Sequence, residues 1–411
     1  MTTSEYRTDV LIVGGGIAGI TAALDLLDAG QTVTIVDRDT QDNFGGLAKW
    51  AFGGMFFVGT KEQRRSGIRD SVELALRDWY SYAEFTDDEI WGRKWADQYV
   101  HLCTPHSYHW LKKKGFSFFP VVNWTERGLL KPGNSVPRFH MIWGTGWGLI
   151  QDLINQLRNH PSANKLQLIF QARVRQLLLT NQQVTGVRGT YEDSGAEFTV
   201  TAEQTIMATG GINGDIERVK ANWYKTWGDP PETILNGAHP YAVGDLHDAT
   251  RQANGNVVNL DKQWNYAAGI RHYQPRKADH GLSLVPCKSA LWLNYRGERM
   301  GPMPLVTAYD TRYLVERICQ EPVKYSWQVL NYTIAKKEFA ISGSEHNDHI
   351  RNKKFLAFVY QTLVTGNTKR VDKVIDRCED VVVGRSVDEL VEKMNALTGE
   401  IRYNPSANYY G

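Results

Sequence analysis

The chain has 411 residues and a formal net charge of +2, so it is long enough for about two or three domains and lacks the strong positive field of a nucleic-acid-binding protein. Its four cysteines, Cys103, Cys287, Cys319 and Cys378, are far apart and form no CxxC pair, which argues against a zinc site, a redox dithiol or a disulfide framework. No stretch approaches the roughly 18 apolar residues of a membrane span, and the first apolar run is not a secretory signal, so we expect a cytoplasmic protein.

The N-terminal residues carry a nucleotide-binding pattern. An apolar run at residues 9–13 leads into the sequence GGGIAG at 14–19. A helical pattern at 17–29 and a second apolar run at 32–36 follow. A glycine motif alone is weak evidence, but here the strand before it and the helix after it agree. The pattern therefore predicts a dinucleotide cradle.

Each glycine of this motif has its own physical role. Gly14 allows a tight turn out of the first strand, Gly16 lets the backbone approach a pyrophosphate, and Gly19 lets the helix lie close to the sheet. The first amide groups of the helix, at Ile17 and Ala18, favour negative charge. We therefore expect the diphosphate of the nucleotide at this turn.

Two charged residues follow the second apolar run. Asp37 falls where a carboxylate can accept hydrogen bonds from both ribose hydroxyls. For a nicotinamide dinucleotide, Arg38 next to this acid could also contact a 2′-phosphate on the ribose.

The rest of the chain alternates glycine-rich, helical and strand-like segments. Two Gly-Gly pairs, Gly45-Gly46 and Gly53-Gly54, flank an apolar stretch. Periodicity then predicts helices at 61–82, 87–114, 145–159, 309–319, 354–365 and 390–397, and strands at 166–170, 173–180, 183–191, 197–201 and 204–207. The last strand ends in Ala208-Thr209-Gly210-Gly211, and Ser386 begins a capping box before the last helix.

The order of these motifs resembles the fumarate reductase and 3-ketosteroid dehydrogenase superfamily of flavoproteins, over nearly the whole chain. The resemblance rests on GGGIAG, Asp37, the two Gly-Gly pairs, the strand end at 208–211, Gly244-Asp245 before a helix, the hairpin at 293–299 and the helix start at 383–390. It implies an α/β fold: a Rossmann-like FAD-binding domain at 1–285, with a parallel sheet and a β-meander, and a smaller α+β substrate domain at 286–411.

The resemblance also implies which residues bind FAD. Gly14, Gly16 and Gly19 would hold the pyrophosphate and Asp37 the adenosine ribose. The remaining positions would follow the path of the cofactor: Gly45, Gly46, Gly53 and Gly54 on the flavin side, Val174 at the adenine, Ala208, Thr209, Gly210 and Gly211 over the ribose, and Asp245 near the flavin end. Some relatives join FAD to a histidine ahead of the second Gly-Gly pair; because no histidine lies between Asp37 and Gly54, we expect non-covalent FAD.

The expected reaction is dehydrogenation of a CH–CH unit next to a ketone in an apolar, steroid-like substrate. It needs a base, a hydride acceptor and a donor to the developing enolate. The family's ketosteroid branch uses tyrosines, for which Tyr266, Tyr309 and Tyr313 are candidates here, with Arg299 as an enolate stabiliser. Each also has a structural interpretation, as a packed aromatic or a salt-bridge residue. His239, His247, His272 and His280 show no metal-like spacing.

Two alternatives stay open. The first is a fumarate or enoate reductase, against which the segment at 264–270 counts, because it lacks the histidine-proline-threonine-glycine sequence of that branch. The second is a shortened, non-catalytic nucleotide-binding protein, because the sequence stops before the glycine-rich return to the FAD domain. The sequence does not specify the electron acceptor or the oligomeric state.

Overall fold

The computed structural model describes residues 3–120, 133–285, 287–301 and 311–399. The chain divides by its internal contacts into two compact units. Unit 1 contains residues 1–51, 146–224 and 238–263, and unit 2 contains residues 52–145, 225–237 and 264–411. Residues 52–145, which the sequence analysis places within 1–285, group with unit 2. The expected domain bounds, 1–285 and 286–411, stay a prediction.

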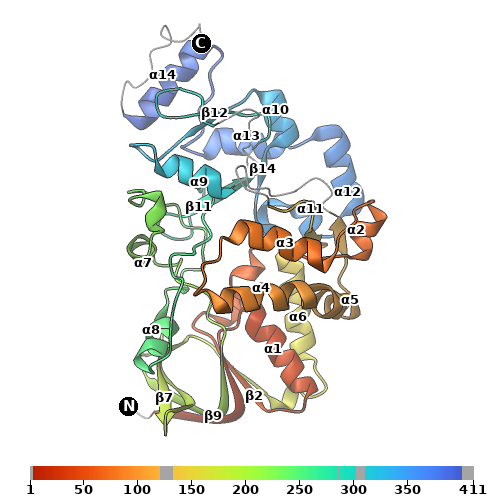
Figure 1. The fold of residues 1–411 in the computed structure, drawn as a ribbon, viewed down its shortest axis with the longest axis vertical. Coiled ribbons are helices and arrows are strands. Elements are labelled where there is room, and N and C mark those ends of the chain that lie inside the picture. Colours follow the sequence, from red (N-terminus) through yellow and green to blue (C-terminus); the bar gives the residue numbers. More distant parts are fainter. Residues whose placement is uncertain (1–2, 121–132, 286, 302–310, 400–411) are drawn as a thin grey trace. The chain divides into compact units, whose positions relative to one another are not determined.

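Unit 1 is built on a six-stranded sheet in the order β6-β2-β1-β9-β8-β7. Strands β6, β2, β1 and β9 are parallel, and β9, β8 and β7 form an antiparallel meander (Figure 1). The strands are β1 (Ser4–Val13), β2 (Val33–Val36), β6 (Leu166–Ile169), β7 (Ala172–Thr180), β8 (Gln183–Tyr191) and β9 (Glu197–Met207). The helices are α1 (Ile17–Asp28), α6 (Thr145–Arg158), α7 (Ile216–Ala221) and α8 (Asp245–Gln252).

Burial on both faces of this sheet accounts for the continuous apolar runs in the sequences of β1 and β2. All four residues of β2 are buried, as are the last four of β1, because parallel strands are covered on both faces. Leu11, Val36 and Phe198 belong to one cluster that extends to Leu246 of α8. The expected α/β class, with a parallel sheet and a meander, is confirmed. One detail differs: the strands expected at 197–201 and 204–207 are the single strand β9.

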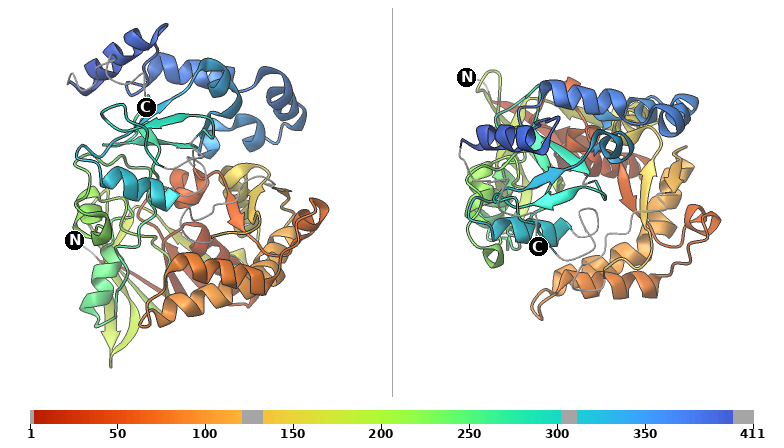
Figure 2. Two further views of the ribbon diagram at one scale, coloured as in Figure 1. Left: turned by 45° about the horizontal axis from the view of Figure 1, so that its top comes forward. Right: turned by 90° about the horizontal axis from the view of Figure 1, so that it is seen from above.

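Unit 2 contains three small antiparallel sheets among the described residues: β3-β5-β4, β10-β11-β14 and β12-β13. Strands β10 and β11 are drawn in teal in Figure 2. The strands are β3 (Gly54–Phe56), β4 (Phe118–Pro120), β5 (Phe139–Ile142), β10 (Gly269–Arg271), β11 (Gly281–Val285), β12 (Leu291–Leu293), β13 (Trp327–Val329) and β14 (Ala340–Ile341).

The helices of unit 2 follow the expected bounds only in part, and α14 is longer than the expected 390–397. They are α2 (Lys61–Arg65), α3 (Val72–Ala83), α4 (Ile90–Leu102), α5 (His109–Lys113), α9 (Thr311–Cys319), α10 (Tyr332–Glu338), α11 (Asp348–Arg351), α12 (Phe355–Tyr360), α13 (Thr368–Arg377) and α14 (Val387–Thr398). The helix expected at 61–82 is two helices, because Gly67 has a φ of +73° and Ser71 starts a new helix by accepting a hydrogen bond from Leu74. The serine cap expected at Ser386 is present, since its hydroxyl accepts from the Glu389 N–H.

Candidate functional site

The turn between β1 and α1 has little room for side chains on one side and is open on the other. Gly14 has a φ of +107°, and a Cβ on it would lie 2.4 Å from the carbonyl oxygen of Ala208. A Cβ on Gly19 would lie 2.0 Å from the carbonyl oxygen of Gly14. By contrast, a Cβ on Gly16 would meet no heavy atom of the described residues within 4 Å. Open space therefore adjoins Gly16.

This open space lies at the N-terminus of α1. Gly16 is the N-cap residue, the first turn carries no acidic residue, and no side chain of the described chain caps its amide groups. Uncapped N–H groups at a helix start, next to free space, suit an anionic group such as a diphosphate. Ile17 and Ala18 lie in the first turn of α1, and their contact with a diphosphate stays a prediction.

The first Gly-Gly pair packs against this turn. The N–H of Gly45 donates to the carbonyl oxygen of Gly15 at 3.0 Å, and a Cβ on Gly46 would lie 3.3 Å from the Cα of Gly16. Both glycines have positive φ values, +113° and +57°. Two segments that are separated in the sequence thus form one backbone-lined surface in unit 1.

Asp37 is directed back to the glycine turn. Its Oδ2 accepts from the N–H of Gly15 at 2.5 Å, and its Oδ1 accepts from the N–H of Asp39 at 2.7 Å. Burial raises the pKa of Asp37, while these two hydrogen bonds oppose the rise. The carboxylate therefore lies beside the open turn, where a ribose would follow the diphosphate.

Arg38 is held by acidic and aromatic neighbours. Its Nε donates to Glu192 at 2.6 Å, its guanidinium lies 3.5 Å from Asp245, and it stacks over the ring of Tyr241 at 4.4 Å. An arginine with these partners is engaged within the protein. This arrangement argues against Arg38 as the receptor of a 2′-phosphate.

Asp245 belongs to the same ion-pair cluster. Arg173 of β7 donates to both of its carboxylate oxygens, at 2.7 and 2.8 Å. Partial burial raises the pKa of Asp245, but the arginine hydrogen bonds and charge hold it below its usual value. These contacts join Asp245 to Arg38, the neighbour of Asp37. A place for Asp245 near the flavin end stays a prediction.

Two further predicted sites belong to the sheet of unit 1: Val174 within β7, and the segment 208–211 directly after β9. Val174 is buried on β7 and pairs with Gly189 of β8. The N–H of Ala208 donates to Val13 at 2.8 Å, so the segment Ala208, Thr209, Gly210 and Gly211 leaves the sheet beside the glycine turn. The segment 208–211 thus follows the carboxyl end of a parallel strand, where nucleotides bind in such sheets. Val174 lies in the antiparallel meander, and its contact with adenine stays a prediction.

The second Gly-Gly pair belongs to unit 2. A Cβ on Gly54 would lie 1.7 Å from the ring of Phe139, so the packing of β3 against β5 already requires glycine there. Gly53 has a φ of +86°, and its carbonyl oxygen accepts from Ile142 at 3.0 Å. Contact of Gly53 and Gly54 with a flavin stays a prediction.

One candidate catalytic residue contacts a buried apolar cluster, Trp292, Met300 and Leu314, and two others are next in sequence to residues of that cluster. Tyr313 of α9 packs on this cluster, and so does Ala267, the neighbour of Tyr266. Arg299 is exposed on the hairpin strand that leads into Met300. Tyr266 is 53% exposed and stacks on Trp264, with ring centroids 6.2 Å apart. Tyr309 lies outside the described residues.

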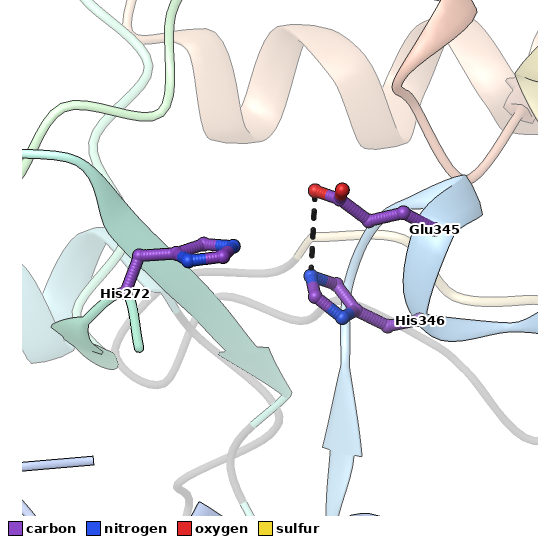
Figure 3. Close-up of side chains that lie close together, drawn as sticks. All are labelled: His272, Glu345 and His346. Atoms are coloured by element: carbon purple, nitrogen blue, oxygen red, sulfur yellow. Dashed lines mark ion pairs between the residues drawn. The ribbon is translucent and has the colours of Figure 1, made fainter. Parts of the chain in front are cut away.

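Sequence reasoning missed a cluster of histidines in unit 2. His272, Glu345 and His346 place their ligand atoms within 4.8 Å of one another, and Figure 3 shows the His272 ring directed toward the other two side chains. His280 stacks on His272 at 4.3 Å. The residues are far apart in the sequence, and the pairing of β11 with β14 brings them together. No local spacing signals this contact.

The cluster is electropositive. Burial, together with neighbouring positive charge, lowers the pKa of His280 and of His346 to about 4. Burial lowers the pKa of Lys277 to about 8. Arg276 forms an ion pair with Glu345, the acid of the group.

The hydrogen bonds of His272 favour a donor over a metal ligand. The N–H of Gln274 donates to Nδ1 of His272 at 2.8 Å, so the neutral ring carries its proton on Nε2. This Nε2–H is buried and has no hydrogen-bond partner among the described residues. A cation would need a lone pair at that atom, whereas an oxygen acceptor would satisfy it.

Comparisons with known proteins agree with the nucleotide site. Residues 9–395 match the FAD binding domain family. The chain is 38% identical to the KsdD-like steroid dehydrogenase of Mycobacterium tuberculosis, over 95% of this chain and 71% of that protein. It is 29% identical to the fumarate reductase (cytochrome) of Shewanella frigidimarina, over 61% of this chain and 41% of that protein. The solved structure of 3-ketosteroid-delta4-(5alpha)-dehydrogenase from Rhodococcus jostii RHA1 matches with a TM-score of 0.57 at 17% identity, over 81% of this chain and 68% of that one, which shows a shared fold.

Proposed function

The chain belongs to the FAD binding domain family, and from this premise we propose that it dehydrogenates a CH–CH unit next to the ketone of a steroid-like substrate. It is an FAD-dependent oxidoreductase, and FAD is its cofactor. The observation that carries the substrate proposal is the 38% identity to a KsdD-like steroid dehydrogenase, which extends over 95% of the chain.

The residues of unit 1 fit FAD. In this proposal the amide groups at Gly16, Ile17 and Ala18 bind the diphosphate, because a Cβ at Gly16 would occupy otherwise open space. Asp37 holds the adenosine ribose, and the backbone of Gly45, which hydrogen-bonds to Gly15, borders the path of the cofactor. FAD stays non-covalent, since no histidine lies between Asp37 and Gly54. When bound, FAD supplies the acceptor for the hydride.

The substrate residues are assigned to unit 2. One tyrosine, as its phenolate, removes the proton next to the ketone and becomes a neutral phenol, and the hydroxyl of a second tyrosine donates to the ketone oxygen. We assign these roles among Tyr266, Tyr309 and Tyr313, and Arg299 stabilises the enolate charge. What supports this assignment is the packing of Tyr313 on the buried cluster of Trp292, Met300 and Leu314, which holds that ring in place in unit 2.

A second candidate function is the reduction of an unsaturated carboxylate such as fumarate. The buried Nε2–H of His272 favours it, because this donor lies among positive charges that suit a carboxylate oxygen. Against it stands the weaker likeness to the Shewanella frigidimarina fumarate reductase, which covers 61% of this chain.

Anaerobic spectroscopy of the full chain loaded with FAD tests both functions. We expect the flavin absorbance to bleach when a 3-ketosteroid is mixed with the oxidised protein. We expect the absorbance of viologen-reduced flavin to stay unchanged when fumarate is added. An unchanged spectrum across a panel of 3-ketosteroids would remove the steroid proposal. Rapid reoxidation of reduced flavin by fumarate would establish the second candidate in its place.

A further inference from the structure

Helix α12 and the π-helical turn that follows it, Gln361–Thr365, expose large apolar side chains. Leu356 is 82% exposed and Leu363 is 79% exposed, with Val364 at 60% and Tyr360 at 59%. Leu356, Tyr360 and Val364 follow a spacing of four residues, so they lie on one side of the helix. We call Leu356, Tyr360, Leu363 and Val364 the α12 patch.

The opposite side of α12 is anchored in unit 2. The ring of Phe358 lies 5.7 Å from that of Phe119 and 6.4 Å from that of Trp143, measured between centroids. Phe355 also contacts Trp143. Because aromatic packing fixes the inner side of the helix, the α12 patch is a fixed surface and not the flank of an unattached segment.

The segment that carries the α12 patch has charge of one sign between Asp348 and Asp372, the acidic residues that flank it. Residues 349–371 contain no Asp or Glu, but they contain Arg351, Lys353, Lys354, Lys369 and Arg370. The three lysines are exposed. Helix α10 adds Lys336 beside the end of the turn, since the carbonyl oxygen of Lys336 accepts from the Asn367 N–H at 2.8 Å. An apolar surface is thus bordered by positive charge at both ends.

Exposed apolar side chains bordered by lysines suit some binding partners better than others. A two-fold contact with a second copy would set lysines against lysines around the apolar residues, which is unfavourable. An anionic bilayer surface takes both features, because apolar side chains enter the acyl boundary while lysines meet the headgroups. Helix α12 and its turn are far shorter than the roughly 20 residues of a span, and no described helix is long and apolar enough to cross a bilayer.

We propose that the α12 patch docks this protein onto the surface of an anionic lipid bilayer, with Leu356, Leu363 and Val364 inserted and Lys353, Lys354 and Lys369 on the headgroups. This inference concerns attachment and not catalysis. It holds whichever substrate the enzyme oxidises, so the failure of one proposal leaves the other intact.

Sedimentation with vesicles tests the docking. The full chain is mixed with vesicles of phosphatidylcholine alone, or of phosphatidylcholine mixed equally with phosphatidylglycerol. We expect binding to the mixed vesicles that weakens at least roughly tenfold in high salt, because exposed charges are screened. Binding to pure phosphatidylcholine should be weaker by a similar factor.

Two variants and a matched control locate the surface. Leu356→Ser with Leu363→Ser should lower partition into mixed vesicles roughly tenfold or more, since two inserted side chains are lost. Lys354→Glu with Lys369→Glu should do the same and remove most of the salt dependence. Leu179→Ser, at a leucine of β7 that is 45% exposed, should change nothing. Circular dichroism checks that each variant is folded.

Two outcomes would overturn the proposal. One is an equal affinity of the parent chain and the Leu356→Ser, Leu363→Ser variant for the mixed vesicles. The other is a parent chain that ignores vesicles but sediments as a dimer or with an acidic protein, and loses that association in the same variant. In that case the α12 patch is a protein interface.

Discussion

At the scale of single residues, two glycines of the first turn have different roles: Gly14 is required by the packing of the chain, and Gly16 by the proposed ligand. Gly14 is required by its φ of +107° and by the Ala208 carbonyl oxygen, whereas Gly16 is the extended N-cap of α1 and faces open space. A side chain at Gly14 therefore disturbs the folded chain itself. A side chain at Gly16 disturbs only what occupies that space.

We predict opposite effects for two valine variants. Gly16→Val should leave the free energy of unfolding of the FAD-free chain within about 1 kcal/mol of the parent value and abolish FAD binding, because the added methyl groups fill the expected diphosphate position. Gly14→Val should destabilise the FAD-free chain by about 2 kcal/mol or more, through left-handed strain and overpacking. Urea unfolding and FAD fluorescence titration measure the two effects. Tight FAD binding by Gly16→Val would contradict the assigned cradle.

A single histidine gives a pH prediction. Burial lowers the pKa of His346 to about 4, below the 6.5 of an exposed histidine. Between these values the unfolded chain binds more protons than the folded one, so stability is complete above pH 6.5 and falls as the pH drops toward 4. The loss due to His346 should be about 3 kcal/mol at most.

Urea midpoints measured from pH 7 to pH 4 check this slope. Because carboxylates also titrate in this range, His346→Gln serves as the control, since glutamine keeps a polar side chain and has no charge to gain. The variant should lose stability less steeply than the parent chain over the same interval. Parallel curves would mean that His346 is not buried in its neutral form.

At the scale of elements, a buried arginine joins β5 to the residues around α3. Arg138 is 1% exposed, and its guanidinium donates to Asp70 at 2.8 Å and to Asp78 of α3 at 2.7 Å. The Asn134 side chain accepts a further hydrogen bond at 2.9 Å. Removing one partner of such a pair leaves buried charge without compensation.

We therefore predict that Arg138→Met lowers the free energy of unfolding by about 3–5 kcal/mol. Adding Asp70→Asn to this variant should restore part of the loss, because one of the two uncompensated carboxylates becomes neutral. Calorimetry or urea unfolding of the single and double variants measures the difference. A double variant that is less stable than Arg138→Met would show that Asp70 has other essential partners.

The same scale shows how far sequence reasoning reaches. The buried runs of β1 and β2 and the meander of β7, β8 and β9 were predictable, because period and turn residues are local signals. The break between α2 and α3 was not predictable, because it depends on the conformation of Gly67 and on the Ser71 cap. A helical period alone does not reveal such a break.

The candidate site also contains some features that the sequence predicts and others that it does not. The glycine turn and Asp37 come from one strand, turn and strand unit, so one stretch of sequence carried their geometry. The contact of Gly45 with Gly15 and the meeting of His272 with His346 depend on packing between distant segments. The ion pairs that occupy Arg38 and Asp245 likewise come from β7 and the turn after β8, which no motif encodes.

At the scale of the whole molecule, the proposed FAD site combines three separated segments of unit 1, near Gly16, Gly45 and Ala208. A ligand that contacts all three binds only the folded chain. By mass action it then stabilises the fold by about 2.7 kcal/mol at a free concentration of 100 times the dissociation constant.

We predict that added FAD raises the unfolding temperature of the FAD-free chain by several degrees, and that the rise grows with the logarithm of FAD concentration. Differential scanning fluorimetry, with tryptophan fluorescence as the signal, measures this rise. Acid precipitation of the FAD-loaded chain should release all of the yellow colour into the supernatant. The reason is that no histidine lies between Asp37 and Gly54 to hold FAD covalently. Gly16→Val is the control: its unfolding temperature should not respond to FAD. An unchanged temperature for the parent chain, or colour retained in the pellet, would contradict a non-covalent FAD site made by these three segments.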